Sequence, residues 1–185
     1  MPNVLNVTTG KPKVGGAVYR AASGTTPPTD AVTALASAFK ELGYASDDGL
    51  TNIFSGTVNK IHAWGGDVVL VNRTDMEDQF KVTLIEVSNE ETLKAIRNAA
   101  NVTGALGTGL TVKYNGADPE EAVWVFELIY RNSVVKRIVI PRGVVSDVAE
   151  VNYTDDDAVG YQITIDAIAD SNGNTHYEYL KSTAA

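Results

Sequence analysis

The feature that most constrains this chain is a pair of apolar segments separated by two polar residues. Residues 122–131 read AVWVFELIYR and residues 134–140 read VVKRIVI, with Asn132 and Ser133 between them. Segments rich in β-branched and aromatic residues around a short polar break predict an antiparallel hairpin. The chain must therefore build a sheet that contains at least two strongly apolar strands.

Both faces of this hairpin carry apolar side chains, because side chains alternate between the two faces of a strand. One face of the first strand carries Trp124, Phe126, Leu128 and Tyr130. The other face mixes apolar and charged side chains, namely Val123, Val125, Glu127, Ile129 and Arg131. An antiparallel sheet in a small protein usually leaves one face polar, so the second face needs a cover. Another sheet of the same chain or a neighbouring subunit can supply it, and this need indicates assembly.

The charge of the chain limits its partners. The chain has 185 residues and a net charge of -8. A surface of this sign disfavours binding to nucleic acid or to an anionic membrane through a basic patch. It still permits DNA to pass nearby, because an acidic surface repels the DNA phosphates and does not bind them. The length and an apolar share of 44% predict one domain with a sizeable core.

No motif with catalytic or ligand-binding chemistry stands out. The chain has no cysteine, which excludes disulfides and thiol nucleophiles. His62 and His176 lack ligand partners at metal spacing and are predicted at the surface or at a rim. Residues 104–109 are glycine-rich but follow a predicted helix, which favours a flexible connector over a phosphate loop. We interpret the acidic stretches 155–157 and 170–174 as solvated turns, and predict no catalytic residue, cofactor or metal.

The N-terminal residues show no secretory signal. They lack a basic segment followed by an apolar one, and no run approaches the roughly 20 apolar residues that span a membrane. Synthesis in a cytoplasm is therefore expected. We expect an N-terminal arm at residues 1–13, a single domain at residues 14–181 and a short C-terminal tail at residues 182–185.

Two helices are predicted from apolar spacing and capping residues. The spacing over residues 30–42 predicts a helix with its N-cap at Thr29 or Asp30. Residues 88–91, SNEE, form a capping box that predicts a flanking helix over about residues 89–99. Both helices would lie beside a larger set of strands.

The rest of the pattern is typical of β-structure. Besides the hairpin, strands are predicted at residues 14–22, 58–64, 67–73, 79–87, 111–114, 159–167 and 176–180. Gly65 and Gly66 form a turn, and residues 159–167 alternate strictly between apolar and other side chains. The predicted fold is mainly β, an antiparallel β-sandwich or barrel with one flanking helix at about residues 89–99.

A long loop is predicted at about residues 44–57. A structureless loop of this length is uncommon unless it is functional or orders on binding. We expect a subunit interface on it at Tyr44, Asp47, Asp48, Leu50, Ile53 and Phe54. Its large apolar side chains would be poorly used in solvent, so they either anchor a partner or pack back on their own domain.

Several segments together resemble a known family. They are residues 42–50 (LGYASDDGL), 63–69 (AWGGDVV), 85–93 (IEVSNEETL), 136–141 (KRIVIP), and 161–165 (YQITI) before the turn that ends at Gly173. Their order and spacing over roughly residues 14–180 resemble the major tail proteins, or tail tube proteins, of bacteriophages with long non-contractile tails.

The resemblance implies a β-sandwich whose six copies close into a ring, with rings stacked into a tube around a lumen through which DNA passes. It also implies a structural role in the virion, contacts made by the loop and the terminal arms, and tape-measure, terminator and tail-tip proteins as partners. Gln162, Thr164 and Asp166 form a polar face that could line the lumen or meet solvent outside the tube.

Two other functions stay open from the residues alone. A β-sandwich module that binds carbohydrate or a receptor would use exposed aromatic side chains such as Trp64 and Tyr153. A tail-completion or secretion-tube ring protein would share most of the features above.

Overall fold

The computed structural model describes residue 2, residues 4–13 and residues 16–183. The strands are β1 Gly10–Pro12, β2 Val18–Ala22, β3 Lys40–Glu41, β4 Ala45–His62, β5 Val68–Leu84, β6 Val102–Ala105, β7 Gly109–Val112, β8 Ala122–Tyr130, β9 Val134–Val148, β10 Tyr161–Ala167 and β11 Tyr177–Ser182. The helical elements are α1 Glu90–Arg97 and the 3-10 turns η1 Val4–Asn6, η2 Ala99–Asn101 and η3 Arg131–Ser133.

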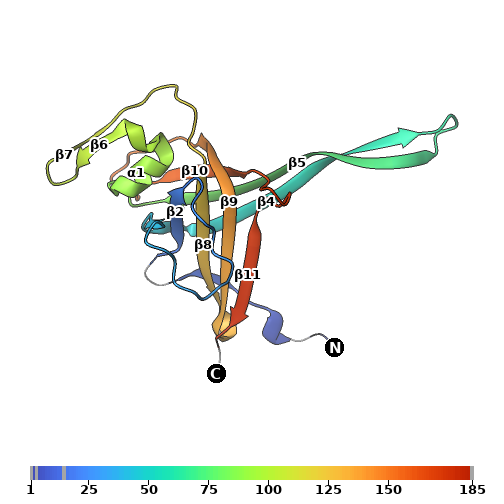
Figure 1. Cartoon of the computed structure of the whole chain (residues 1–185), viewed down its shortest axis with the longest axis horizontal. Coiled ribbons are helices and arrows are strands. Elements are labelled where there is room, and N and C mark those ends of the chain that lie inside the picture. Colours follow the sequence, from blue (N-terminus) through green and yellow to red (C-terminus); the bar gives the residue numbers. More distant parts are fainter. Residues whose placement is uncertain (1, 3, 14–15, 184–185) are drawn as a thin grey trace.

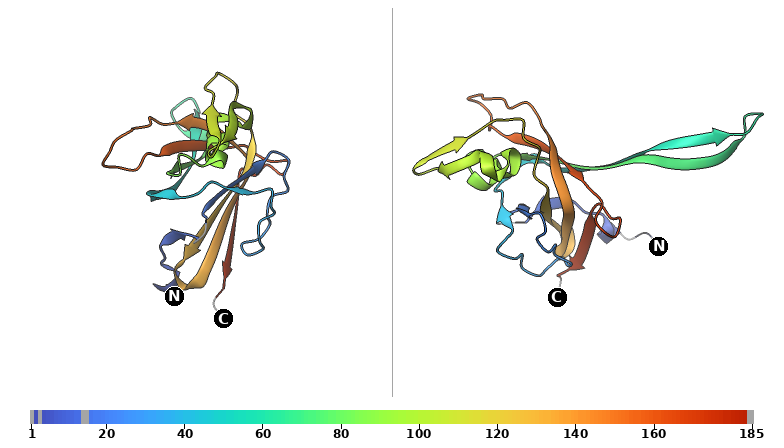
Figure 2. Two further views of the ribbon diagram at one scale, coloured as in Figure 1. Left: turned by 90° about the vertical axis from the view of Figure 1, so that its left-hand side faces the viewer. Right: turned by 45° about the horizontal axis from the view of Figure 1, so that its top comes forward.

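The strands form two layers, and strand β9 takes part in both. Its first half pairs with β8 on one edge and with β11 on the other. Its second half pairs with β10, and β5 and β4 follow beyond β10. Strands β1, β2 and β3 extend the first layer on the side of β8. The two layers cross steeply in Figures 1 and 2, and every pair is antiparallel, so the predicted fold class is confirmed.

The main core lies between these layers. The second layer contributes buried apolar side chains at Phe80, Val82, Leu84, Ile163 and Ile165. The first layer contributes Trp124, Phe126, Ile138 and Ile140. Helix α1 adds Leu93 and Ile96 to the same cluster. The alternation predicted for the hairpin at residues 122–140 is therefore confirmed, with the Trp124 face turned into the core.

The passage of β9 between the layers depends on a small residue at position 143. The Trp124 indole Nε1 donates a hydrogen bond to the Gly143 carbonyl over 3.3 Å. A Cβ at position 143 would lie 2.6 Å from Trp124 Cδ1 and 3.0 Å from Ile165 Cγ2. Both neighbours are fully buried and have little room to move.

Replacing Gly143 with alanine should therefore destabilise the fold. We expect Gly143→Ala to lower the free energy of unfolding by about 1–3 kcal/mol, the usual cost of overpacking a core. Urea denaturation measures it. Gly107→Ala is the matched control, because a Cβ there meets nothing within 4 Å. Equal stability of the two variants would contradict this account of the bend.

The second face of the β8–β9 hairpin is covered by the same chain. Val123, Val125 and Val139 form a second buried cluster, against which Leu35 and Phe39 of the segment between β2 and β3 pack. The need for a cover is thus met within one molecule. This face gives no support for assembly, which must be argued from other surfaces.

The covering segment is not the helix predicted over residues 30–42. Asp30 does accept hydrogen bonds from the Val32 and Thr33 amides, both at 2.6 Å, as a cap would. Hydrogen bonds from Thr33 and Val32 lower the pKa of the Asp30 carboxyl to about 2. The buried Arg137 guanidinium, however, donates to the carbonyls of Asp30 and Thr33 over 2.8 and 2.9 Å. Since a helix would use these carbonyls for its own amides, the tertiary contact replaces the helix.

The flanking helix is confirmed as α1, but its cap differs from the prediction. The Asn89 side chain accepts the Glu91 amide over 3.0 Å, so Asn89, and not Ser88, is the N-cap. The flexible connector expected at residues 104–109 instead holds the end of β6, a turn and the start of β7, and the two strands pair as a small hairpin. The two expected strands at residues 67–73 and 79–87 are one continuous strand, β5.

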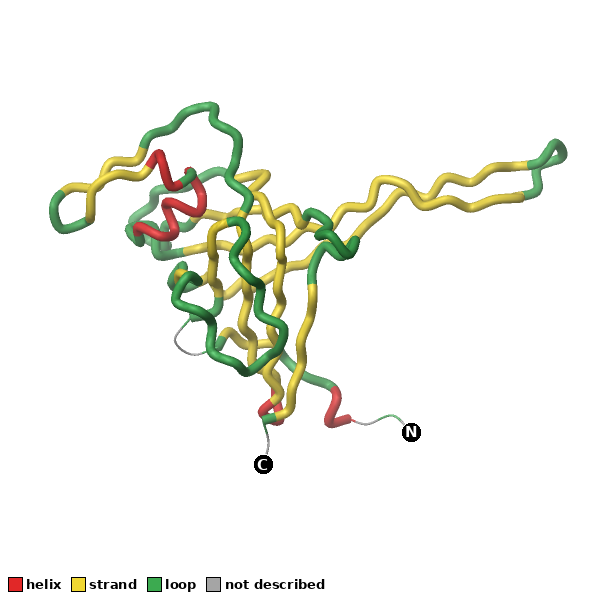
Figure 3. The backbone as a smooth tube through the Cα atoms, in the orientation of Figure 1, coloured by secondary structure: helices red, strands yellow, loops and turns green. Residues whose placement is uncertain are grey.

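The predicted loop at about residues 44–57 is also wrong, because this segment is the first part of β4. Strand β4 pairs with β5 from Ala45 and Leu84 at the body to His62 and Val68 at the far end. Bulges near Gly49 and Gly56 interrupt the pairing, and the residues that suggested a loop lie at these bulges. The outer part of the hairpin, residues 53–77, is exposed throughout and projects far from the body in Figures 1 and 3. We call residues 53–77 the arm.

Candidate assembly surfaces

The arm exposes large apolar side chains on a two-stranded ribbon. They are Ile53, Phe54, Val58, Ile61, Trp64, Val68, Val69, Leu70, Val71 and Met76. Trp64, in the turn at the tip, is 107% exposed. An isolated two-stranded hairpin is marginally stable in water, and contiguous exposed apolar surface marks an interaction site. The arm is therefore a candidate interaction surface.

The two cations of the arm lie in its outer part, whereas two of its three acids, Asp75 and Glu77, lie near its base. Residues 57–74 carry Lys60 and Arg73 against a single acid, Asp67, whereas the whole chain has a net charge of -8. Lys60 and Arg73 share one face of the ribbon, because Arg73 pairs with Val58, two residues from Lys60. Within the described residues, neither cation forms an ion pair. The outer part of the arm, residues 57–74, thus carries a small positive charge that suits an acidic surface.

A buried carboxylate holds the base of the arm. Asp78 is 4% exposed and accepts hydrogen bonds from Asn52 Nδ2 over 2.8 Å and from Thr175 Oγ1 over 2.5 Å. His176 Nδ1 lies 2.5 Å from the same carboxylate, and its ring meets Phe80 edge-on. His176 is thus a mostly covered residue at the arm base, whereas His62 is exposed on the arm. The contacts connect β4, β5 and the turn before β11.

Replacing Asp78 should loosen this joint. We expect Asp78→Asn to lower the free energy of unfolding by about 1.5–3 kcal/mol, the range for hydrogen bonds to a charged group. The amide keeps the shape of the side chain but removes the charge. Urea denaturation compares it with Glu77→Gln, a matched change on the exposed neighbour. A loss no larger than that of the control would show that the network adds little.

A large cavity opens in the body beside the root of the arm. Its volume is about 830 Å³. Val82, Phe126 and Ile138 line it and are at most 4% exposed. Further lining comes from residues 45–50 and from the N-terminal segment around Gly10 and Pro12. We call this the body cavity; its floor is apolar.

The edge of the body cavity is charged. Asp47 and Asp48 line it from the first residues of β4, and Lys136 and Glu178 line it as an ion pair 2.6 Å long. Burial opposes the charged form of Lys136, but hydrogen bonds and charge interactions with Glu178 and Tyr130 together outweigh it and raise the pKa of that ammonium. An apolar floor within a polar edge is the usual anatomy of a protein interface.

The predicted interface residues thus fall on two surfaces. Asp47, Asp48 and Leu50 line the body cavity, and Ile53 and Phe54 begin the arm. Exposed Tyr44 precedes β4. Sequence reasoning missed Lys60, Trp64 and Arg73 as candidates. The signal for them was the run of four apolar residues, 68–71, after the Gly65–Gly66 turn, because consecutive residues of a strand point to opposite faces and such a run makes both faces apolar.

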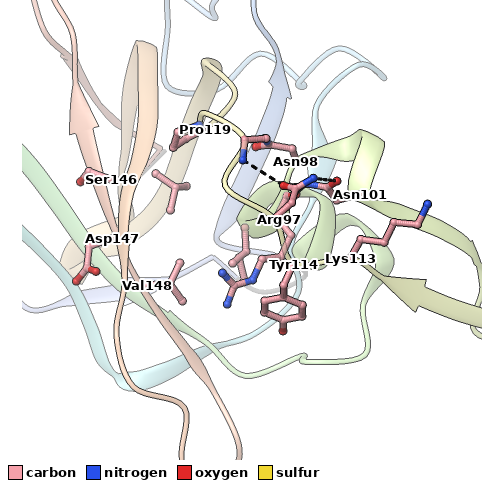
Figure 4. Close-up of a pocket in the computed structure, with 13 residues that line it drawn as sticks. Arg97, Asn98, Asn101, Lys113, Tyr114, Pro119, Ser146, Asp147 and Val148 are labelled. Carbon is pink, nitrogen blue, oxygen red and sulfur yellow. Dashed lines mark hydrogen bonds between the residues drawn. The ribbon is translucent and has the colours of Figure 1, made fainter.

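A smaller pocket of about 260 Å³ lies between the end of α1, residues 113–119 and β9 (Figure 4). The Arg97 guanidinium lies over the Tyr114 ring, 4.3 Å from its centroid. The buried Arg97 Nε has no hydrogen-bond partner among the described residues. The side-chain amides of Asn101 and Asn115 donate hydrogen bonds to each other's oxygens over 3.1 and 3.0 Å, and so connect the turn after α1 to the residues that follow β7. The pocket offers a cation and amides to a ligand or partner.

The candidate lumen residues lie on the outer face of β10. Gln162 is exposed, Asp166 is half-buried, and Thr164 is 9% exposed beneath its neighbours. Their cross-strand partners on β5 are Thr83, Gln79 and Lys81, so the polar character continues across the strands. The relevant surface is therefore this polar sheet face as a whole.

Cofactor and membrane features were sought in the described part of the chain. Its His, Asp and Glu side chains form no group of three or more that could hold a metal ion. No helix there combines the length and the apolar character needed to cross a bilayer.

The fold and these surfaces are those of a structural protein: a β-sandwich with a long projecting hairpin, the arm, that exposes apolar side chains. The family described as phage tail tube protein matches residues 12–185, almost the whole chain. The chain belongs to this family, and it is a structural component of a bacteriophage tail. A comparison with curated proteins gave no match.

Proposed function

We propose that copies of this chain close into rings of six, and that the rings stack into a hollow tube through which DNA passes during ejection. The observation that carries the proposal is the arm, an exposed two-stranded ribbon with apolar side chains on both faces. A subunit with such a projection contacts its neighbour through two different surfaces. Heterologous contacts of this kind generate closed rings or open-ended stacks.

The polar outer face of β10 and β5 is the proposed lumen wall, with Gln162, Thr164 and Asp166 on it. Lys81 is the single cation among the paired side chains of this face and Asp166 the single acid, so the face offers no basic patch that would hold a polyanion in place. The residues proposed for subunit contacts are Tyr44, Asp47, Asp48, Leu50, Ile53 and Phe54. Because stacking alone has no end point, tape-measure and terminator proteins are proposed to set the length, with tail-tip proteins at one end and synthesis in the bacterial cytoplasm.

Negative-stain electron microscopy of the purified protein over a concentration series tests the proposal, beside size-exclusion chromatography. Hollow tubes or six-fold rings are the expected result. A monodisperse monomer at every concentration, together with affinity in a glycan screen, would favour a binding module that uses Trp64 and Tyr153. These aromatic side chains are 107% and 75% exposed.

A further inference from the structure

The body cavity has the size and character of a docking site for a protein segment. Its volume of about 830 Å³ exceeds what one side chain fills. Beside the buried core residues of its floor, Leu50, Leu128 and Tyr130 line it and are half-buried, so they leave apolar surface uncovered. An occupant would therefore bury apolar surface that the chain itself leaves open.

The arm tip of the same molecule cannot be that occupant. The ladder runs from Leu50 and Val82 at the body to His62 and Val68 near the tip. At about 3.3 Å per residue, the paired stretch between Leu50 and His62 measures about 40 Å. The tip also points away from the body in Figures 1 and 3. Only a second copy can bring an arm tip to this cavity.

The arm tip and the cavity are complementary in character. Trp64 is fully exposed at the tip, and aromatic side chains of this kind bury about 150–250 Å² in an interface. Lys60 and Arg73 lie behind it on one face, and Asp47 and Asp48 lie at the cavity edge. Buried tryptophan and arginine dominate the energetics of many interfaces. Charge pairing at the edge would fix the orientation.

We propose that the arm tip of one copy, led by Trp64, docks in the body cavity of a second copy, with Lys60 and Arg73 facing Asp47 and Asp48. This inference rests on the proposed function and names the partner surface of the arm. Since tip and cavity are different surfaces, each bound copy still offers one of each, and the contact repeats from copy to copy.

Disulfide trapping tests the contact directly, because the chain has no cysteine of its own. The test variant carries Lys60→Cys and Asp48→Cys, two positions that face each other in the proposed contact, and keeps Trp64. A disulfide needs Cα atoms about 4.4–6.8 Å apart, so with an arm of this length any bond must join two copies. The matched control carries Lys60→Cys and Asp156→Cys, since Asp156 is an exposed acid outside the cavity. We expect a ladder of covalent oligomers on a non-reducing gel for the test pair and none for the control.

Charge exchange provides a second readout. Lys60→Glu with Arg73→Glu should abolish assembly, and adding Asp47→Lys with Asp48→Lys should restore it. Tubes without the disulfide ladder, or no rescue by the exchanged charges, would overturn the docking inference while leaving the tube function intact. Absence of tubes and rings from the unmodified chain would overturn the proposed function itself.

Discussion

Removing residues 56–76, most of the arm, should abolish assembly without unfolding the subunit. Ser55 and Glu77 are paired across the ribbon, so residues 56–76 can be replaced by an Asn-Gly turn that closes a two-residue hairpin. The core residues Phe80 and Val82 lie on the body side of this cut. We expect the free energy of unfolding to change by no more than about 0.5 kcal/mol, as for other surface changes, and tubes to disappear.

The measurement combines urea denaturation with negative-stain electron microscopy. Leu106→Ala is the control, because Leu106 is 68% exposed in the turn of the β6–β7 hairpin and its loss should leave the tubes intact. Tubes of normal appearance from the shortened chain would show that assembly uses other surfaces. A large loss of stability would show that the arm belongs to the fold.

Breaking the buried ion pair between Glu127 and Arg137 should cause the largest loss of stability. Their side chains are 5% and 1% exposed. Arg137 Nε donates to Glu127 over 2.9 Å, and Lys13 reaches the other carboxylate oxygen over 2.6 Å. We expect Arg137→Met to lower the free energy of unfolding by about 3–5 kcal/mol, because it leaves the Glu127 charge buried with only the half-exposed Lys13 as its partner.

The double variant Arg137→Met with Glu127→Leu is the matched control. It removes both charges and keeps apolar volume in the cluster around Val125 and Val139. We expect it to recover part of the stability lost in the single variant, since replacing a buried pair by apolar residues is often close to neutral. Urea denaturation of both variants compares their free energies of unfolding. A single variant as stable as the unmodified chain would contradict the role given to the pair.

The elements that local patterns predicted are those whose local and tertiary preferences agree. The hairpin β8–β9 combines β-branched residues, a two-residue break and a buried face at Trp124, and all three point to the same structure. Strand β10 and helix α1 were predicted for the same reason. The turn at Gly65 and Gly66 was predicted because glycine tolerates the positive φ that tight turns require, and both glycines have positive φ in the structure.

The elements that failed depend on contacts between distant residues. The segment over residues 30–42 has helical spacing, but Arg137, more than a hundred residues away in sequence, takes its carbonyls. Residues 44–57 contain loop-forming Asp47, Asp48 and Gly49, yet the ladder with β5 makes them a strand with a bulge. Local propensity does not contain such information.

The candidate site shows the same division. Leu50 was predicted at an interface because a large apolar side chain is poorly used in solvent, and Asp47 and Asp48 because they lie on the same predicted loop; all three line the body cavity. The cavity itself was not predictable, because its floor comes from Phe126, Val82 and the N-terminal segment, which meet only in the folded chain. A docking role for these residues stays a prediction until an assembly is imaged.

Cryo-electron microscopy of the assembled protein tests the central claim most directly. The account predicts a hollow tube of stacked rings, with the polar face of β10 and β5 around the lumen and each arm tip seated on another copy. A solid filament, or a tube with that face outside and the arms free in solvent, would contradict it.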